Sequence, residues 1–160
     1  MEATVSGITS DIAADCAAAK TAARALAGAS TDSKNEALAA IAAGLVERSE
    51  EILAANVQDL SDEHAAGLTD ALIDRLTLTA ERIEAIAAGA REVARLDDPV
   101  GEEIESRILD NGLELKKVRV PLGVVAVVYE ARPNVTIDCA VLTIKSGNAI
   151  ILRGGKEAIH

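Results

Sequence analysis

Apolar residues recur at helical spacing through the first hundred positions of the chain. A first face runs from Ile8 to Leu26 and ends before Gly28, a residue type that interrupts helices. A second face predicts one helix that reaches about Leu60, with Asn56 as a candidate interruption. The inner positions of this second helix are Leu38, Ile41, Leu45, Ile52 and Leu53. The first part of the chain is therefore expected to be a helical scaffold.

Cap residues indicate where these helices begin. Ser33 stands three residues before Glu36, the spacing of a capping box, and Ser30 and Thr31 are equal candidates for the same cap. Two more helices are predicted, one over Thr69 to Leu76 with Leu72 and Ile73 inward, and one capped by Thr79 with inner residues Ile83, Ile86, Ala90 and Val93. Cys16 falls on an apolar helix face, which predicts a packed residue and no nucleophile. His64 is expected on a solvated surface.

The pattern changes near Pro99 from helical spacing to β-branched runs. Val and Ile number 12 in the first hundred residues and 15 in the last sixty. Residues 103–109 and 113–120 predict two strands, joined by a tight turn at Asp110-Asn111-Gly112 in which Asn and Gly both adopt positive φ. Alternation of Leu113 and Leu115 with polar neighbours predicts one covered and one wet face. An isolated hairpin is marginal in water, so a partner subunit is a candidate for its support.

The last forty residues predict the start of a parallel sheet. The continuous apolar run from Val124 to Tyr129 is typical of a strand buried on both faces. A helix is predicted from about Val135 to Lys145, closed by Ser146-Gly147-Asn148, and a second buried strand over residues 149–152. A further helix is predicted to begin at Glu157. The fold class is thus α/β: alanine-rich helices, a β-hairpin arm and the first βαβ unit of a parallel Rossmann-like sheet.

Composition narrows the class of protein. The net charge is −10, and residues 1–100 carry all of it, which disfavours binding to nucleic acid. The longest stretches free of charge have ten residues, half of the roughly 20 that a membrane span needs. The acidic start of the chain has no basic segment of a signal peptide, which predicts a cytoplasmic protein. Two cysteines and two histidines are too few for a disulfide framework or a metal cluster.

Two loops lie where ligands bind in parallel sheets, beyond the carboxyl ends of the strands. The first, Glu130-Ala131-Arg132-Pro133-Asn134, offers Arg132 as a fork for a carboxylate or phosphate and Asn134 as an amide donor to an oxyanion. Ordinary capping and turn roles are the alternative for both residues. The second loop, Arg153-Gly154-Gly155-Lys156, pairs two glycines with two cations before a predicted helix, a plausible anion site. The chain has neither a P-loop nor a G-x-G-x-x-G fingerprint.

Two segments resemble one known family. They are Val120-Pro-Leu-Gly-Val-Val-Ala-Val-Val-Tyr-Glu-Ala-Arg-Pro-Asn-Val-Thr136 and Lys145-Ser-Gly-Asn-Ala-Ile-Ile-Leu-Arg-Gly-Gly-Lys-Glu157, supported by Leu72-Ile-Asp-Arg-Leu76 and Asp98-Pro-Val-Gly101. They are similar to the γ-glutamyl phosphate reductases, also called glutamate-5-semialdehyde dehydrogenases, of the aldehyde dehydrogenase superfamily. The resemblance covers about residue 13 to the end, and it implies an N-terminal fragment of such an enzyme.

The resemblance implies an activity and a set of roles. The family reduces L-glutamyl 5-phosphate to the semialdehyde with NADPH, releasing phosphate, in proline biosynthesis. It implies Asn134 as oxyanion donor, Arg132 at the substrate, residues 153–156 at NADP, and a homo-oligomer in the full-length enzyme. No residue here matches the family's nucleophilic cysteine; Cys139 is expected to pack inside its helix, and the chain alone is expected to be inactive.

Charge independently favours NADP, because Arg153 and Lys156 suit its 2′-phosphate while Glu157 is expected to point away. The expected divisions are 1–100 for the helical part of the cofactor domain, 101–121 for an oligomerisation arm and 122–160 for the start of the NADP-binding sheet. Two other hypotheses remain at this point. One is a stand-alone helical interaction module with a hairpin arm, and the other is a phosphate-binding regulatory domain that uses the Arg153 loop.

Overall fold

The structure is a computed structural model that describes residues 12–62 and 67–160. Its helices are α1 (Ile12–Ala27), α2 (Thr31–Glu47), α3 (Ser49–Ser61), α4 (Asp70–Leu76), α5 (Ala80–Arg95) and α6 (Pro133–Lys145). Its strands are β1 (Glu103–Ile108), β2 (Glu114–Val118), β3 (Val124–Val128) and β4 (Ala149–Arg153). Ile8 and His64 lie outside the described residues.

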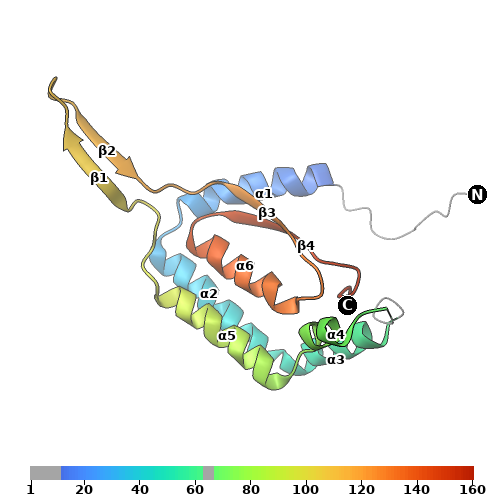
Figure 1. The fold of residues 1–160 in the computed structure, drawn as a ribbon. Helices are drawn as coiled ribbons and strands as arrows, with labels where there is room; N and C mark the ends of the chain where they lie inside the picture. The colour runs from blue at the N-terminus through green and yellow to red at the C-terminus, as the bar shows by residue number, and fades with distance from the viewer. Residues whose placement is uncertain (1–11, 63–66) are drawn as a thin grey trace, which may run out of the picture.

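The elements form layers around the short sheet of β3 and β4 (Figure 1). Helix α1 packs on one face of this sheet and α6 on the other, and α2 and α5 lie beyond α6. The buried residues between the helices are mostly small, namely Leu38, Ala42, Ala87, Ala90 and Val141. Alanine at these positions lets the three helix backbones approach closely, which confirms the helical scaffold. No described helix is long and apolar enough to cross a membrane.

The second predicted helix is capped by Ser30 and consists of two helices, α2 and α3. Ser30 is the N-cap of α2, and its hydroxyl accepts the N–H of Ser33 at 3.1 Å. The prediction of one helix to Leu60 was wrong, because the chain breaks at Arg48 and begins again as α3. Asn56 does not interrupt α3; it is buried and bonds to the link between α4 and α5. Thr79 caps α5 as predicted, and Leu76 rather than Ile73 is the buried residue of α4.

The packed role predicted for Cys16 was wrong. Cys16 and Ile12 are both exposed on α1, whose only buried residue is Ala23 near the other end of the helix. Helix α1 packs mainly on β4 and to a smaller extent on β3. Because the described sheet has only these two strands, it leaves the first turns of the helix uncovered. Cys139 lies half-buried on α6, in keeping with the packing expected there.

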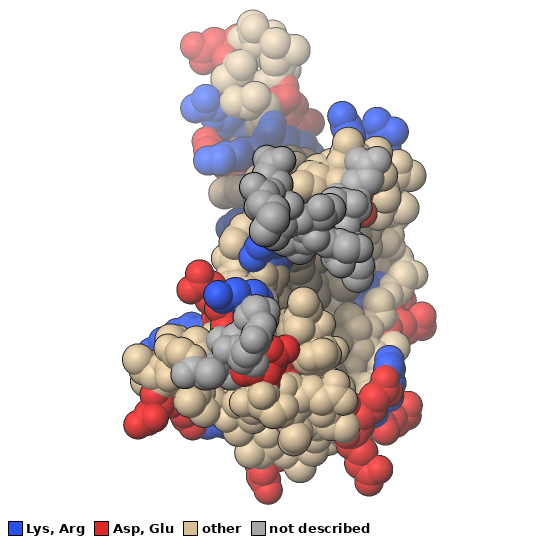
Figure 2. All heavy atoms as spheres, turned by 90° about the vertical axis from the view of Figure 1, so that its right-hand side faces the viewer, with Lys and Arg blue, Asp and Glu red and all other residues tan. Residues whose placement is uncertain are grey.

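The hairpin projects from the body of the molecule (Figure 1). Strands β1 and β2 pair antiparallel, with Ile108 opposite Glu114, and every residue of both strands is exposed. The predicted covered face was therefore wrong within this chain. Figure 2 shows acidic and basic side chains mixed along the hairpin at its faded top. The turn also differs from the prediction: only Gly112 has positive φ, and Gly112 N–H donates to Leu109 O as in a three-residue loop.

Strands β3 and β4 run parallel, which confirms the predicted βαβ unit. Val124 pairs with Ala149 and Val128 with Arg153. Gly147 ends α6 at a φ of 74°, and a Cβ there would lie 2.9 Å from Pro121, so glycine fits both the turn and the close approach. Burial of β3 on both faces was predicted wrongly: its residues alternate between exposed and half-buried. A sheet of two strands leaves both of its outer edges open.

The helix predicted to start at Glu157 is absent from the structure. Residues 156 and 157 form a turn, and the chain reaches His160 without helical structure. The second loop therefore has no helix N-terminus beside it.

Candidate functional site at the carboxyl edge of the sheet

The carboxyl ends of β3 and β4 lie side by side and bring the two predicted loops together. Tyr129 N–H, just after β3, donates to Arg153 O at 3.1 Å. The parallel register also pairs Val128 with Arg153, so both loops leave the same edge of the sheet. This is the edge at which open parallel sheets bind ligands.

The first loop turns sharply into α6. Ala131 is buried and has a φ of 43°, in the left-handed region where a side chain costs roughly 1–2 kcal/mol. Arg132 is the N-cap residue of α6 and Pro133 follows in its first turn, which suits the fixed φ of proline. The Tyr129 hydroxyl bonds to Thr136 on α6. The backbone is thus held in one conformation where Arg132 and Asn134 emerge.

Arg132 and Asn134 line a common pocket of about 370 Å³. The other walls come from α4, α5 and the link between them: Asp74, Arg75, Thr77, Leu78, Arg82 and Ile86. Asn134 donates its amide N–H to Asp138 Oδ2 at 3.0 Å, one turn further along α6. That bond uses one amide hydrogen and leaves the second for another acceptor.

Three guanidinium groups make this pocket positive. Arg82 is held in place by Asp74, with Nη2 2.8 Å from Oδ1, and by Thr77 O at 2.7 Å. Among the described residues, neither Arg75 nor Arg132 forms an ion pair within 4.0 Å. Arg132 and Asn134 were predicted from the sequence, whereas Arg75 and Arg82 were not, since no pattern along the chain indicates that α4 faces the first loop.

The second loop places two cations next to two glycines. Arg153 is exposed and donates to Gly154 O at 2.9 Å, and Lys156 is exposed as well. Neither makes an ion pair with another described residue. Gly154 packs on the Tyr129 ring, where a Cβ would lie 3.7 Å from the ring. A Cβ at Gly155 would displace the end of the flexible Glu157 side chain and would lie 3.4 Å from the Cα of Glu130.

The sequence predicted that Glu157 points away from this loop, and that prediction was wrong. Its Oε2 is buried, has no hydrogen-bond partner and lies against Gly155. A turn in place of the predicted helix folds this side chain back over the glycines. The loop therefore presents two cations and one carboxylate.

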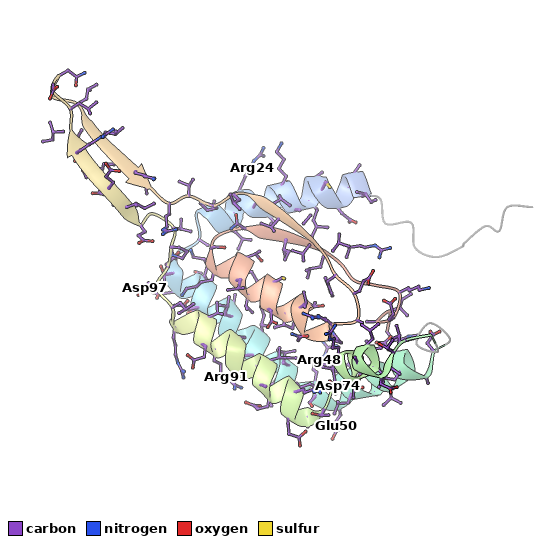
Figure 3. The ribbon with its side chains drawn as sticks, viewed as in Figure 1. Arg24, Arg48, Glu50, Asp74, Arg91 and Asp97 are labelled. Atoms are coloured by element: carbon purple, nitrogen blue, oxygen red, sulfur yellow. The ribbon has the colours of Figure 1, made fainter. Side chains whose placement is uncertain are left out.

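A larger, mainly apolar cavity of about 600 Å³ adjoins both loops. Its walls include Tyr129 and Gly154 from the sheet edge, Thr136 from α6, and Asn56 and Asp59 from α3. Arg48, labelled in Figure 3, also lines it and is paired with Glu51, with Nη2 2.7 Å from Oε1. Hydrogen bonding to this carboxylate raises the pKa of Arg48, and the guanidinium lowers the pKa of Glu51.

Known proteins resemble this chain closely. A γ-glutamyl phosphate reductase from Vibrio cholerae is 59% identical over 140 residues, which are 88% of this chain and 34% of that protein. The crystal structure of the γ-glutamyl phosphate reductase from Thermotoga maritima has a TM-score of 0.87 at 41% identity, over 92% of this chain and 36% of its own. Over most of its length the chain is therefore similar to the γ-glutamyl phosphate reductases. It spans about a third of the length of the curated relatives it matches.

The superfamily fold is evident in a more distant structure. A probable aldehyde dehydrogenase from Listeria monocytogenes has a TM-score of 0.63 at 20% identity, over 88% of this chain and 28% of its own. This likeness shows the fold alone, and it confirms the predicted aldehyde dehydrogenase-like architecture. No protein-family model matches the chain.

Proposed function

We propose that this chain is the N-terminal third of an enzyme that reduces L-glutamyl 5-phosphate to L-glutamate 5-semialdehyde with NADPH. The observation that carries the proposal is the 59% identity to the γ-glutamyl phosphate reductase of Vibrio cholerae over 88% of the chain. The reaction balances as acyl phosphate, NADPH and a proton giving aldehyde, NADP⁺ and inorganic phosphate. It is a step of proline biosynthesis, and a cytoplasmic location remains a prediction.

The cofactor, when bound, supplies the hydride that reduces the acyl carbon. Arg153, Gly154, Gly155 and Lys156 are the proposed cofactor residues. Two exposed cations without carboxylate partners among the described residues suit a 2′-phosphate, and paired glycines allow close backbone approach. Glu157 is the one acid in this loop, and the balance of charge still favours NADP over NAD.

The first loop is proposed to bind the substrate. Asn134 has an amide hydrogen free to donate to the oxygen of the acyl carbon as negative charge develops there. Arg132 is proposed to bind an acidic group of the substrate in the same pocket, because a guanidinium forks onto carboxylate or phosphate. A pocket that holds three arginines and one aspartate suits a substrate that carries several negative charges.

The nucleophile is proposed to come from the two thirds of the relatives that this chain does not cover. Cys139 is half-buried within α6 and Cys16 is on the exposed part of α1. A thiolate gives a thioester, which accepts hydride readily. The chain by itself is therefore expected to be inactive.

The hairpin of β1 and β2 is proposed as an oligomerisation arm over residues 101–121, between the helical part, 1–100, and the cofactor sheet, 122–160. Support comes from its exposure: Ile108, Leu113 and Leu115 are all open to solvent on a ribbon that projects from the body. Strand ribbons of this kind are marginal unless another surface covers them.

The proposal is tested in the completed reductase, meaning this chain followed by the two thirds of the Vibrio cholerae relative that it does not cover. The assay follows NADPH oxidation and phosphate release on L-glutamyl 5-phosphate. We expect one phosphate for each NADPH, and no turnover by the chain alone. A completed reductase that folds and binds NADPH yet leaves the acyl phosphate intact would contradict the proposal.

A further inference from the structure

Helix α3 carries two buried polar side chains on one face, and each one holds a segment distant in sequence. Asn56 is 4% exposed and Asp59 is 7% exposed. Asn56 donates to Leu76 O at 2.9 Å and accepts Leu78 N–H at 2.7 Å. Asp59 Oδ1 accepts the N–H groups of Ile159 and His160 at 2.9 and 3.0 Å.

These two hydrogen bonds of Asp59 hold the far end of the segment that follows β4. The amino side of that segment is fixed at Arg153, whose carbonyl accepts the Tyr129 N–H. Its other side is fixed at Ile159 by Asp59. Residues 154–158 lie between the two anchors and include two glycines, the residue type that loses most conformational entropy on ordering. Without the second anchor, the cations of this loop would occupy many arrangements.

We infer that Asp59 is a positioning residue for the nicotinamide-nucleotide loop, acting through the backbone of Ile159 and His160. The inference rests on the proposed function in one respect, the assignment of residues 153–156 to the cofactor. A carboxylate that accepts two N–H groups forms charge-assisted bonds, which are stronger than neutral ones. Asp59 thus orders the loop in advance and reduces the entropy that binding would otherwise cost.

Asn56 provides a matched control on the same helix. It is equally buried and also makes two hydrogen bonds to a distant backbone, but it holds the α4–α5 link and not the segment after β4. A merely structural role for Asp59 predicts that Asp59→Ala and Asn56→Ala behave alike. A positioning role predicts that only Asp59→Ala loosens the cofactor loop. Asp59→Asn keeps an oxygen acceptor and is the conservative variant.

The first measurement needs no activity: amide hydrogen exchange of residues 153–160 in the completed reductase and its variants. Asp59→Ala should raise exchange in this segment, Asp59→Asn should raise it less, and Asn56→Ala should leave it unchanged while raising exchange near residues 76–78. Equal exchange in Asp59→Ala and wild type overturns the inference. If Asp59→Ala does not fold, the exchange of residues 153–160 is compared between Asp59→Asn and Asn56→Ala. Equal exchange in these two variants then overturns the inference.

The second measurement compares the KM for NADPH with kcat and with the KM for the acyl phosphate in each variant. Asp59→Ala should raise the KM for NADPH about tenfold, which corresponds to about 1.4 kcal/mol, and leave kcat and the KM for the acyl phosphate within about twofold. Asn56→Ala should not raise the KM for NADPH. A rise common to both variants overturns the inference. If wild type shows no NADPH-dependent reduction, the proposed function fails, and the exchange comparison alone then decides the role of Asp59.

Discussion

The ammonium of Lys34 on α2 lies 2.5 Å from Oδ2 of Asp98, just before the hairpin. Lys34 is 2% exposed, and Asp98 also accepts the Thr31 hydroxyl at 2.8 Å and the Val100 N–H at 3.0 Å. This pair joins the helical layer to the segment that leads into β1. It thereby fixes where the hairpin leaves the body of the molecule.

Asp98→Ala should destabilise the chain strongly, because it leaves the Lys34 ammonium buried without its carboxylate. Removing one partner of a buried pair costs about 3 kcal/mol or more. The measurement is the urea midpoint of the chain, with Glu92→Ala as control, since Glu92 pairs with Arg95 on an exposed face of α5. Equal midpoints for the two variants would show that the Lys34 pair contributes no more than a surface pair.

The Asp98 carboxylate is expected to make the stability of the fold depend on pH. Burial acts to raise the pKa of Asp98, but the bonds from Lys34, Val100 and Thr31 outweigh it, and the net pKa is lowered. A lowered folded-state pKa stabilises the fold at pH values above the unfolded value of about 3.9. That contribution is lost as the pH falls through the folded-state pKa.

The measurement is the difference in unfolding free energy between wild type and Asp98→Asn from pH 7 to pH 3. We expect the difference to be constant down to about pH 5 and to shrink below about pH 4. A difference that grows on acidification would mean that the pKa of Asp98 is raised.

Asn134→Ala in the completed reductase tests the oxyanion role. Loss of one such donor lowers kcat about 10²–10³-fold, while NADPH binding should change little because Asn134 lies on the first loop. Asp138→Ala is the control: it removes the acceptor of the Asn134 amide but leaves the amide itself. Parallel losses in kcat and NADPH affinity for Asn134→Ala would indicate a structural cap instead.

The hairpin can be removed with little disturbance, because Arg119 N–H donates to Glu102 O at 2.9 Å and the two chain ends are adjacent. Replacing residues 103–118 of the completed reductase with a two-residue turn should lower the number of subunits in its assembly, since the arm would no longer contact a second subunit. Light scattering gives the number of subunits from the mass of the assembly, and the melting temperature at matched subunit concentration shows whether the rest of the fold is intact. An unchanged number of subunits would exclude the hairpin as an oligomerisation arm.

Local signals in the sequence predicted most elements correctly. Thr79 as a cap and Gly147 at the end of α6 each act within one helical turn, so the chain alone shows them. The break at Arg48 has no such signal, because apolar spacing continues across it in α2 and α3. Burial also depends on partners: Cys16 and the alternate residues of β3 have apolar patterns whose covering layers this chain does not contain.

The site was predicted only where it follows a strand. Arg132, Asn134 and the Arg153 loop were found because parallel strands place their carboxyl ends at one edge. Arg75, Arg82 and Asp59 come from helices that approach this edge from elsewhere in the chain. One signal was available for α3: Ile52, Asn56 and Asp59 follow one another at core spacing, so two polar residues stand at buried positions.

The assignment of the edge beyond β4 to NADPH is tested most directly by the cofactor preference of Arg153→Ala/Lys156→Ala in the completed reductase. The matched control is Arg91→Ala/Arg95→Ala, which removes the same charge from α5, where Arg91 is labelled in Figure 3. Dissociation constants for NADPH and NADH are measured by titration. We predict that the loop variant loses at least about tenfold in NADPH affinity, as for a lost charge-assisted bond. Its NADH affinity should be nearly unchanged, and the control should bind both nucleotides like wild type. Equal losses for both nucleotides, or none, would contradict it.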